Sequence, residues 1–148
     1  MNVLVTGGTG FVGQHLTRAL ARAGHDVTAL ARTPDEADLH PEVETVVGDV
    51  TAYDSIEPAF ADRDVVVNLV ALSPLFKSSG GDERHSEVHL GGTENCLQAA
   101  EAHGVGKFVQ MSALGADPDG DNPYIRAKGQ AGRATRDADV DWTIFRPS

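Results

Sequence analysis

Apolar positions along the chain form six short runs of strand type, and segments with apolar residues at helical spacing separate most of them. The run 65–70, in which Asn68 is the only polar residue, is typical of a strand buried on both faces of a parallel sheet. Strands that alternate with helices join through right-handed crossovers, so the pattern predicts an α/β fold with a doubly wound parallel sheet and helices on both faces. The six expected strands are Asn2–Thr6, Asp26–Ala31, Val43–Gly48, Asp64–Val70, Lys107–Ser112 and Asp141–Arg146, and the expected helices span 14–23, 53–61, 86–103 and 123–137.

Two of these helices carry features that bear on packing. The helix over 14–23 is expected to end at Gly24 and to bury an apolar stripe made of Val12, Leu16, Ala19, Leu20 and Ala23. The helix over 86–103 contains Gly91 and Gly92. Because glycines destabilise a helix relative to alanine, we expect a close approach there to the sheet or to a ligand. The polar stretch 73–85 is a candidate lid or substrate loop.

The composition suits a single domain of 148 residues, since 41% of them are hydrophobic. The formal net charge of −10 disfavours a duplex nucleic acid or an anionic membrane surface as partner. The acidic balance resembles that of proteins adapted to high salt, where screening weakens the repulsion between like charges. An ordinary acidic cytosolic protein fits equally well.

Cys96 is the only cysteine, so no internal disulfide can form, and we interpret it as a small core residue. Met1 leads directly into the first expected strand without a signal peptide, and no apolar run approaches the ~20 residues of a membrane span. We therefore expect a reducing, cytoplasmic location with no membrane span. No pattern of His or carboxylate residues around Cys96 indicates a metal site.

A glycine-rich turn follows the first expected strand and precedes a helix. The turn reads either as Gly8-x-Gly10-x-x-Gly13 or as Thr6-Gly7-x-x-Gly10-x-x-Gly13. Glycines let the pyrophosphate of a dinucleotide approach the backbone where a Cβ would clash, and the N–H groups of Phe11, Val12 and Gly13 lie at the positive end of the helix dipole. In this position the pattern predicts dinucleotide binding, although a tight turn that keeps its glycines for packing alone is the alternative.

The end of the second expected strand bears on the choice of cofactor. In NAD-binding proteins an acidic residue about 20 positions after the glycines accepts hydrogen bonds from the adenosine ribose. Ala31 and Arg32 occupy that place here. Arg32 suits a 2′-phosphate and therefore favours NADP slightly over NAD, unless it is simply a solvated loop charge.

Two further strand ends supply candidate cofactor contacts. Asp49 either accepts a hydrogen bond from the adenine amino group, with Val50 against the ring, or caps the helix expected at 53–61. After Asn68 the chain turns away at Ala71, where small residues let a nicotinamide ribose pass close by. All these positions follow the carboxyl ends of strands, the edge at which such sheets bind ligands.

A second constellation lies in the C-terminal third of the chain. Tyr124 and Lys128 are four residues apart on one expected helix and share a face, and Ser112 ends the preceding strand. A nearby ammonium favours the phenolate of a tyrosine, whose pKa is normally ~10, and a serine hydroxyl can hold a substrate oxygen. The alternative is that Tyr124 packs at the start of the helix, behind Asp121 or Asn122 as the cap, while Lys128 is solvated.

The chain resembles the short-chain dehydrogenase/reductase superfamily, in its extended and atypical branches. The resemblance rests on motifs in the family's order: the glycine turn, Gly48-Asp49-Val50, Asn68-Leu69-Val70-Ala71, Gly91-Gly92-Thr93-Glu94-Asn95, Ser112-Ala113-Leu114-Gly115-Ala116, Tyr124-x-x-x-Lys128 and Phe145-Arg146-Pro147-Ser148. The Ser-Ala-Leu-Gly-Ala stretch is most similar to the atypical group that includes the 39 kDa subunit of complex I. Related members resemble NAD-dependent nucleotide-sugar epimerases.

The resemblance implies a Rossmann fold in which Gly7, Gly10, Gly13, Asp49 and Ala71 contact NAD(P) and Ser112, Tyr124 and Lys128 are catalytic. It also implies that the family's substrate-binding portion follows the Arg-Pro-Ser segment, so residues 1–148 read as an N-terminal NAD(P)-binding domain. Self-association through the helices at 86–103 and 123–137 is expected as well. His89 stands where the extended branch usually has Asn, a departure from the pattern.

The function predicted from these features is hydride transfer between a nicotinamide and a carbinol or carbonyl carbon of a small-molecule substrate. Two alternatives remain at this point. One is a non-catalytic NAD(P)-binding sensor or accessory subunit of a respiratory NADH dehydrogenase, and the other is an epimerase that retains its NAD.

Overall fold

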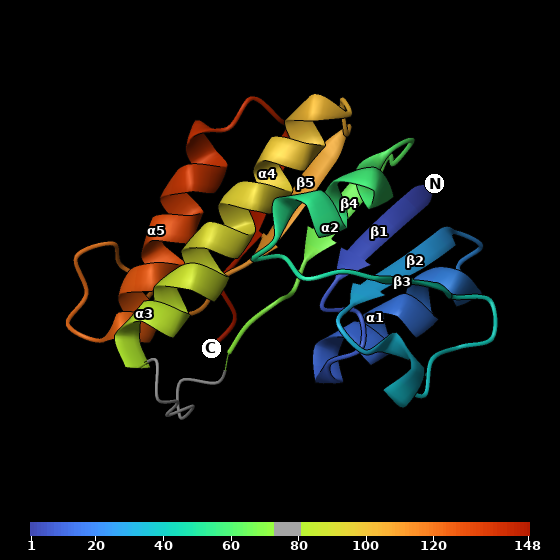
Figure 1. Cartoon of the computed structure of the whole chain (residues 1–148), viewed down its shortest axis with the longest axis horizontal. Coiled ribbons are helices and arrows are strands. Elements are labelled where there is room, and N and C mark those ends of the chain that lie inside the picture. The colour runs from blue at the N-terminus through green and yellow to red at the C-terminus, as the bar shows by residue number, and fades with distance from the viewer. Residues whose placement is uncertain (73–80) are drawn as a thin grey trace.

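The computed structural model describes residues 1–72 and 81–148, and a parallel six-stranded sheet forms the centre of this part of the chain (Figure 1). The strand order is β3-β2-β1-β4-β5-β6, and every neighbouring pair is parallel. This order confirms the predicted doubly wound sheet. The strands are β1 (Asn2–Thr6), β2 (Asp26–Ala31), β3 (Glu44–Val47), β4 (Val65–Asn68), β5 (Lys107–Met111) and β6 (Trp142–Phe145).

Helices cover both faces of the sheet, as predicted. The face that carries Val3 and Val27 packs against α1 (Phe11–Arg22). The face that carries Leu4 and Phe108 packs against α2 (Tyr53–Ile56), α4 (Gly92–Ala102) and α5 (Pro123–Asp137). In Figure 1, α4 and α5 lie side by side. Short 3-10 turns occur at Pro34–Glu36 and Glu57–Phe60.

Helix α1 packs on the sheet with a different face from the predicted one. Gly13, Thr17 and Ala21 are buried, Leu16 and Leu20 are partly buried, and the other members of the expected stripe, Val12, Ala19 and Ala23, are exposed. The helix also begins at Phe11 rather than at residue 14. At the first turn the close approach is explicit, because a Cβ on Gly13 would lie 2.3 Å from the Gly7 carbonyl oxygen, while Leu16 and Leu20 pack against the core from the flank of the buried face.

The two expected helices after β3 and β4 are both interrupted. Pro58 lies early in the 3-10 turn that replaces the second half of the helix predicted at 53–61, since proline has no N–H to donate to an α-helical ladder. The segment predicted as a helix from residue 86 begins earlier, with α3 (Gly81–His85), and passes through a π-helical turn at Ser86–Gly91 before α4. Residues 81–85 are thus helical rather than loop. The rest of the candidate lid, 73–80, lies outside the described residues.

The predicted close approach at the paired glycines is confirmed for one of them. A Cβ on Gly92 would lie 2.7 Å from Cγ2 of Val50, so α4 packs directly on the segment after β3. A Cβ on Gly91 would meet no atom nearer than 3.9 Å. At α5 the expected cap is confirmed as Asn122, whose Oδ1 accepts from the N–H groups of Tyr124 at 2.8 Å and Ile125 at 3.3 Å.

Candidate functional site

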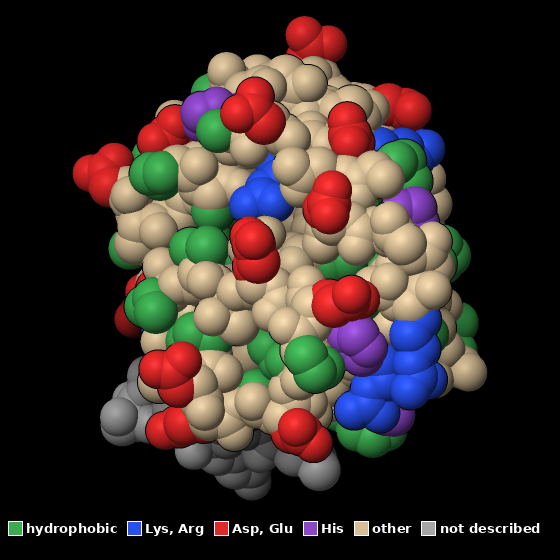
Figure 2. Space-filling view, turned by 90° about the vertical axis from the view of Figure 1, so that its right-hand side faces the viewer, with side chains coloured by type: hydrophobic (Ala, Val, Ile, Leu, Met, Phe, Trp, Pro, Cys, Tyr) green, Lys and Arg blue, Asp and Glu red, His purple; other side chains and the backbone are tan. Residues whose placement is uncertain are grey.

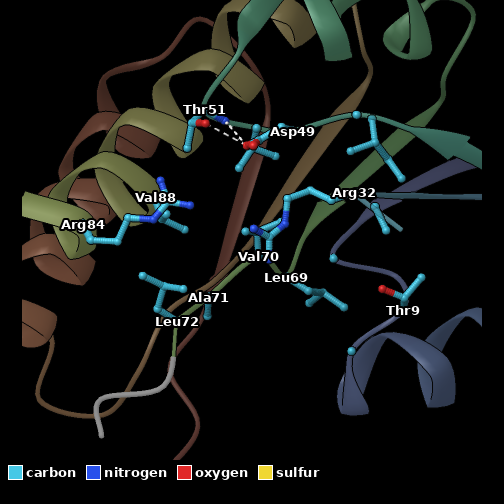
Figure 3. Close-up of a pocket in the computed structure, with 16 residues that line it drawn as sticks. Thr9, Arg32, Asp49, Thr51, Leu69, Val70, Ala71, Leu72, Arg84 and Val88 are labelled. Carbon is cyan, nitrogen blue, oxygen red and sulfur yellow. Dashed lines mark hydrogen bonds between the residues drawn. The ribbon is translucent and has the colours of Figure 1, made fainter. Parts of the chain in front are cut away.

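A cavity of about 260 Å³ opens at the carboxyl ends of β1, β2, β3 and β4 (Figure 3). This is the edge at which the sequence places the candidate cofactor contacts. The segments at the ends of these four strands form most of its wall, and α3 and the π-helical turn close one side. Its lining consists of Gly7, Thr9, Gly10, Leu30, Ala31, Arg32, Gly48, Asp49, Val50, Thr51, Leu69, Val70, Ala71, Leu72, Arg84 and Val88.

The glycine turn separates into packing positions and a cavity position. Gly7 has a φ of +70°, which favours glycine. A Cβ on Gly13 would lie 2.3 Å from the Gly7 carbonyl oxygen, and one on Gly8 would lie 2.7 Å from the Ala29 Cβ. A Cβ on Gly10 would meet only the Gly7 oxygen, at 3.5 Å, so protein packing does not require a glycine here. Gly10 lines the cavity, where the missing Cβ leaves space for a ligand. Gly7 and Gly10 line the cavity and Gly8 does not, which supports the register beginning at Thr6.

The N-terminus of α1 supplies free donors beside this cradle. The N–H of Gln14 donates to the Gly10 carbonyl at 2.9 Å, and the N–H groups of Phe11, Val12 and Gly13 have no acceptor among the described residues. Phe11 is 82% exposed, and the predicted cofactor contacts Phe11, Val12 and Gly13 are not among the residues that line the cavity. Free N–H groups, a helix dipole and a glycine without a Cβ together suit the pyrophosphate of a dinucleotide.

Asp49 does not cap α2, whose N-cap is Ala52. Its Oδ1 instead accepts from the N–H of Thr51 at 2.9 Å and from the hydroxyl of Thr51 at 2.8 Å. Burial alone would raise the pKa of Asp49, but these hydrogen bonds and the charges of Arg32 and Arg84 outweigh it and lower the pKa below its ordinary value. Asp49 is therefore a carboxylate on the cavity wall, as an adenine amino group requires. Val50 beside it is buried and also lines the cavity.

Two arginines reach the cavity from opposite sides. Arg32 comes from the end of β2 and Arg84 from α3, and their side chains extend toward one another in Figure 3. Arg32 thus lies at the cavity, and its contact with a 2′-phosphate stays a prediction. Arg84 was not identified from the sequence, because nothing in its spacing relates it to the glycine turn, and only the return of α3 to the sheet edge brings it there.

Asn68 occupies a different place from the predicted cofactor contact. It is 3% exposed, and its side chain is fully engaged within the sheet. Its Oδ1 accepts from the Thr6 hydroxyl at 2.6 Å, and its Nδ2 donates to Oγ1 of Thr93 at 3.2 Å and to Oε1 of Gln110 at 2.9 Å. Asn68 is not among the lining residues, and its network joins β1, β4, β5 and α4 behind the cavity wall.

The second constellation is not part of the cavity lining: Ser112 and Lys128 are buried and Tyr124 is half-buried. Lys128 is 3% exposed, and its Nζ donates to the Met111 carbonyl at 2.7 Å, directly before Ser112. The alternative of a solvated lysine is therefore wrong. Burial lowers the pKa of Lys128 to about 8 and raises the pKa of Tyr124 above its ordinary value. The pKa of Tyr124 is thus shifted in the direction opposite to the expected one, and burial of the phenol is the cause.

Two histidines that the sequence analysis did not assign to the site surround Tyr124. The rings of His85 and His89 are stacked with centroids 5.5 Å apart, and both meet the Tyr124 ring edge-on, at 6.0 and 5.3 Å. Nε2 of His89 accepts from the N–H of Leu72 at 3.3 Å, so the neutral ring carries its proton on Nδ1. Burial, with the charges of Lys128 and His85, lowers the pKa of His89 to about 3.

His89 therefore connects the two halves of the site, since it accepts a hydrogen bond from Leu72, which lines the cavity, and packs edge-on against the Tyr124 ring. Its departure from the family's usual Asn was the one sequence signal that pointed here. Within residues 1–72 and 81–148, no cluster of three or more His, Cys, Asp and Glu side chains is arranged to hold a metal ion. Among the same residues, no helix combines the length and apolar character needed to cross a membrane.

A family model described as NAD(P)H-binding matches residues 7–148. The 3-beta-hydroxysteroid dehydrogenase of Mycolicibacterium neoaurum is 36% identical over 115 residues, which cover 75% of this chain and 31% of that protein. The mitochondrial NADH dehydrogenase (ubiquinone) 1 alpha subcomplex subunit 9 of Arabidopsis thaliana is 28% identical over 151 residues, covering 97% of this chain and 37% of that protein.

Among solved structures, a UDP-galactose 4-epimerase superposes with a TM-score of 0.83 at 25% identity, over 99% of this chain and 55% of that chain. The chain thus spans about a third of the length of the two curated relatives and about half of the epimerase. Because the family model covers almost all of it, the chain belongs to the NAD(P)H-binding family, as a Rossmann domain of the epimerase/dehydratase type that its motifs resemble.

Proposed function

We propose that the whole protein is an NAD(P)-dependent oxidoreductase that acts on a hydroxyl or carbonyl group of a small molecule. The observation that carries this proposal is the continuous path from Leu72 on the cavity wall, through His89, to the half-buried ring of Tyr124. It connects a cradle suited to a dinucleotide with a phenol suited to proton transfer. The similarity to a bacterial hydroxysteroid dehydrogenase supports the same class of reaction.

The residues divide the work between binding and proton transfer. Bound NAD(P) supplies the hydride donor or acceptor at its nicotinamide. Gly10 and the N–H groups at the start of α1 hold the pyrophosphate, and Asp49 accepts from the adenine amino group. Tyr124 donates a proton to the substrate oxygen when a carbonyl is reduced, and takes it back in the reverse direction. The raised pKa of the phenol favours its protonated form, which is the form that donates.

Ser112 and Lys128 orient that step. Lys128 places its ammonium on the Met111 carbonyl, which fixes the strand end from which Ser112 projects. The Ser112 N–H donates to the Phe145 carbonyl at 2.7 Å, so β6 holds the same residue from the other side. In this proposal the Ser112 hydroxyl holds the substrate oxygen while the phenol transfers the proton.

We further propose a preference for NADP(H) over NAD(H). Arg32 lines the cavity at the end of β2, where no acidic residue is available to accept hydrogen bonds from the ribose hydroxyls. A guanidinium recognises a phosphate through charge-assisted hydrogen bonds.

Calorimetric titration with NADH and NADPH, followed by turnover assays with sugar nucleotides, hydroxysteroids and small ketones, tests the proposal. We expect saturable binding of both dinucleotides, with NADPH tighter, and oxidation of the cofactor by at least one carbonyl class. Absence of binding to either dinucleotide would exclude the proposed function.

A second candidate is a cofactor-binding accessory subunit without turnover of its own. It is favoured by the similarity to a subunit of the plant NADH dehydrogenase and by the position of Tyr124 and Lys128 outside the cavity lining. Tight NAD(P)H binding with no oxidation by any substrate, together with co-purification in a larger complex, would favour this candidate.

A further inference from the structure

Arg84 is a second cationic side chain on the cavity, and the cofactor contacts proposed for the glycine turn and for Arg32 assign it no role. It lies on α3, one helical turn before Val88, and both residues face the cavity from the same wall. In Figure 3 its guanidinium extends across the cavity toward that of Arg32. Both cations are close enough to Asp49 to act on its carboxyl group.

The charge of the cavity is opposite to that of the chain. Of the residues that line it, those with charged side chains are Arg32, Arg84 and Asp49, an excess of one positive charge that Glu87, outside the lining, offsets while it is paired with Arg84. The chain as a whole carries −10, and Figure 2 shows acidic side chains spread over the side of the molecule that it presents. A local cationic excess in an acidic protein indicates a site for an anion.

Arg84 is held in a way that leaves it available to a ligand. Its Nη1 donates to Oε2 of Glu87 at 2.9 Å, in an ion pair whose side chains are 30% and 55% exposed. Exposed pairs of this kind are weak. A guanidinium has five N–H donors, and the bond to Glu87 uses one nitrogen.

We propose that Arg84 binds a phosphate group of the dinucleotide from the wall opposite Arg32, and that it exchanges Glu87 for that phosphate. This inference rests on the proposed function and adds to it a specificity-determining residue. The phosphate is either the 2′-phosphate of NADP(H) or the pyrophosphate, and both have the geometry that a planar guanidinium recognises.

The test measures the affinities of the purified protein for NADPH, NADH, 2′-AMP and 5′-ADP by titration calorimetry. The variants are Arg84→Ala, Arg84→Lys, Glu87→Gln and, as a control, Arg133→Ala, an exposed arginine of α5 outside the cavity lining. Arg84→Ala should weaken NADPH binding about 10-fold, and Arg84→Lys should restore part of the loss. Glu87→Gln should tighten binding by up to about threefold, because it removes the competing carboxylate.

The ligand set distinguishes the two phosphates. A loss for NADPH and 2′-AMP alone assigns Arg84 to the 2′-phosphate, whereas an equal loss for NADPH, NADH and 5′-ADP assigns it to the pyrophosphate. Affinities within twofold of the parent in both Arg84→Ala and Glu87→Gln would overturn the inference while leaving the proposed function intact. A parent protein that binds no dinucleotide would overturn the proposed function first. Thermal unfolding of each variant verifies that the fold is unchanged.

Discussion

The cavity and the Tyr124 cluster, which consists of Ser112, Tyr124 and Lys128, are joined through His89 but differ in what their chemistry depends on. The cavity side of the glycine turn is defined by missing atoms: Gly10 has no Cβ, and the first N–H groups of α1 have no protein acceptor among the described residues. The cluster exists because polar atoms are enclosed: Ser112 and Lys128 are buried, and Lys128 is bound to a main-chain carbonyl. Adding a methyl group to a glycine of the cavity should therefore impair cofactor binding, whereas removing a polar group from the Tyr124 cluster should impair turnover.

The largest effect is expected from removing the Tyr124 hydroxyl. Tyr124→Phe keeps the ring that packs against His85 and His89, so folding and cofactor affinity should stay close to those of the parent. Turnover by the whole protein should fall ~10²–10⁴-fold, the usual effect of losing a general acid or base. Steady-state rates and cofactor titrations of Tyr124→Phe, with Tyr53→Phe as control, measure this. Near-parental turnover would exclude Tyr124 as the acid or base.

The next effect separates two glycines of one turn. Gly13→Ala places a Cβ 2.3 Å from a carbonyl oxygen, and we expect it to lower the free energy of unfolding by about 4 kcal/mol or more. Gly10→Ala has room for its Cβ and should leave the thermal midpoint nearly unchanged, while it weakens NAD(P)H binding at least ~10-fold by filling the cradle. Thermal melts and cofactor titrations of both variants test this. Equal destabilisation by the two substitutions would contradict the division into packing and cavity positions.

A smaller effect concerns the buried ammonium of Lys128. Its pKa is about 8 in the folded chain and about 10.5 when unfolded, so between these values the unfolded chain binds more protons. The contribution of Lys128 to the free energy of unfolding therefore rises with pH between about 8 and 10.5, and it falls again as the pH returns toward 8. Relative to Lys128→Met, the free energy of unfolding of the parent should rise on the order of 2 kcal/mol from pH 8 to 10.

Denaturant titrations at several pH values measure that difference. Burial raises the pKa of the Cys96 thiol to about 12, which acts in the opposite direction, but it is common to both proteins and cancels in the comparison. Lys107→Met, at an exposed lysine paired with Asp141, serves as control and should keep the parental pH dependence. Parallel pH profiles for the parent and Lys128→Met would show that Lys128 is not a buried cation.

The smallest effect tests the choice of cofactor. Arg32→Ala should weaken NADPH about 10-fold and leave NADH within about twofold, because only NADPH carries the 2′-phosphate that a guanidinium would bind. Titration of both cofactors against Arg32→Ala measures this. An unchanged ratio of the two affinities would contradict the NADP(H) preference.

Local sequence determined most of the framework. Strand β2 and helix α5 begin and end where the pattern of apolar residues predicted, and the Asn122–Pro123 pair fixed the start of α5 through a cap and a preset φ. The parallel, doubly wound class of the sheet followed from the alternation of strands with helices, whereas the order of the strands is given by the structure. These features depend on residues close together in the chain, which is why the spacing of residues identified them. Spacing also identified the site candidates Gly10, Arg32, Asp49, Tyr124 and Lys128.

Contacts between distant segments decided the rest. Asn68 lies at a strand end like Asp49, but the sheet brings Thr6 and Gln110 next to its side chain. Hydrogen bonds to these two residues occupy the amide of Asn68, so it does not face the cavity. Burial of Tyr124 reverses the pKa shift that its spacing to Lys128 predicted. Arg84 reaches the cavity only because α3 returns to the sheet edge. Spacing shows which groups share an element, whereas burial and the partners of a polar atom depend on tertiary packing, which sets the chemistry of each group.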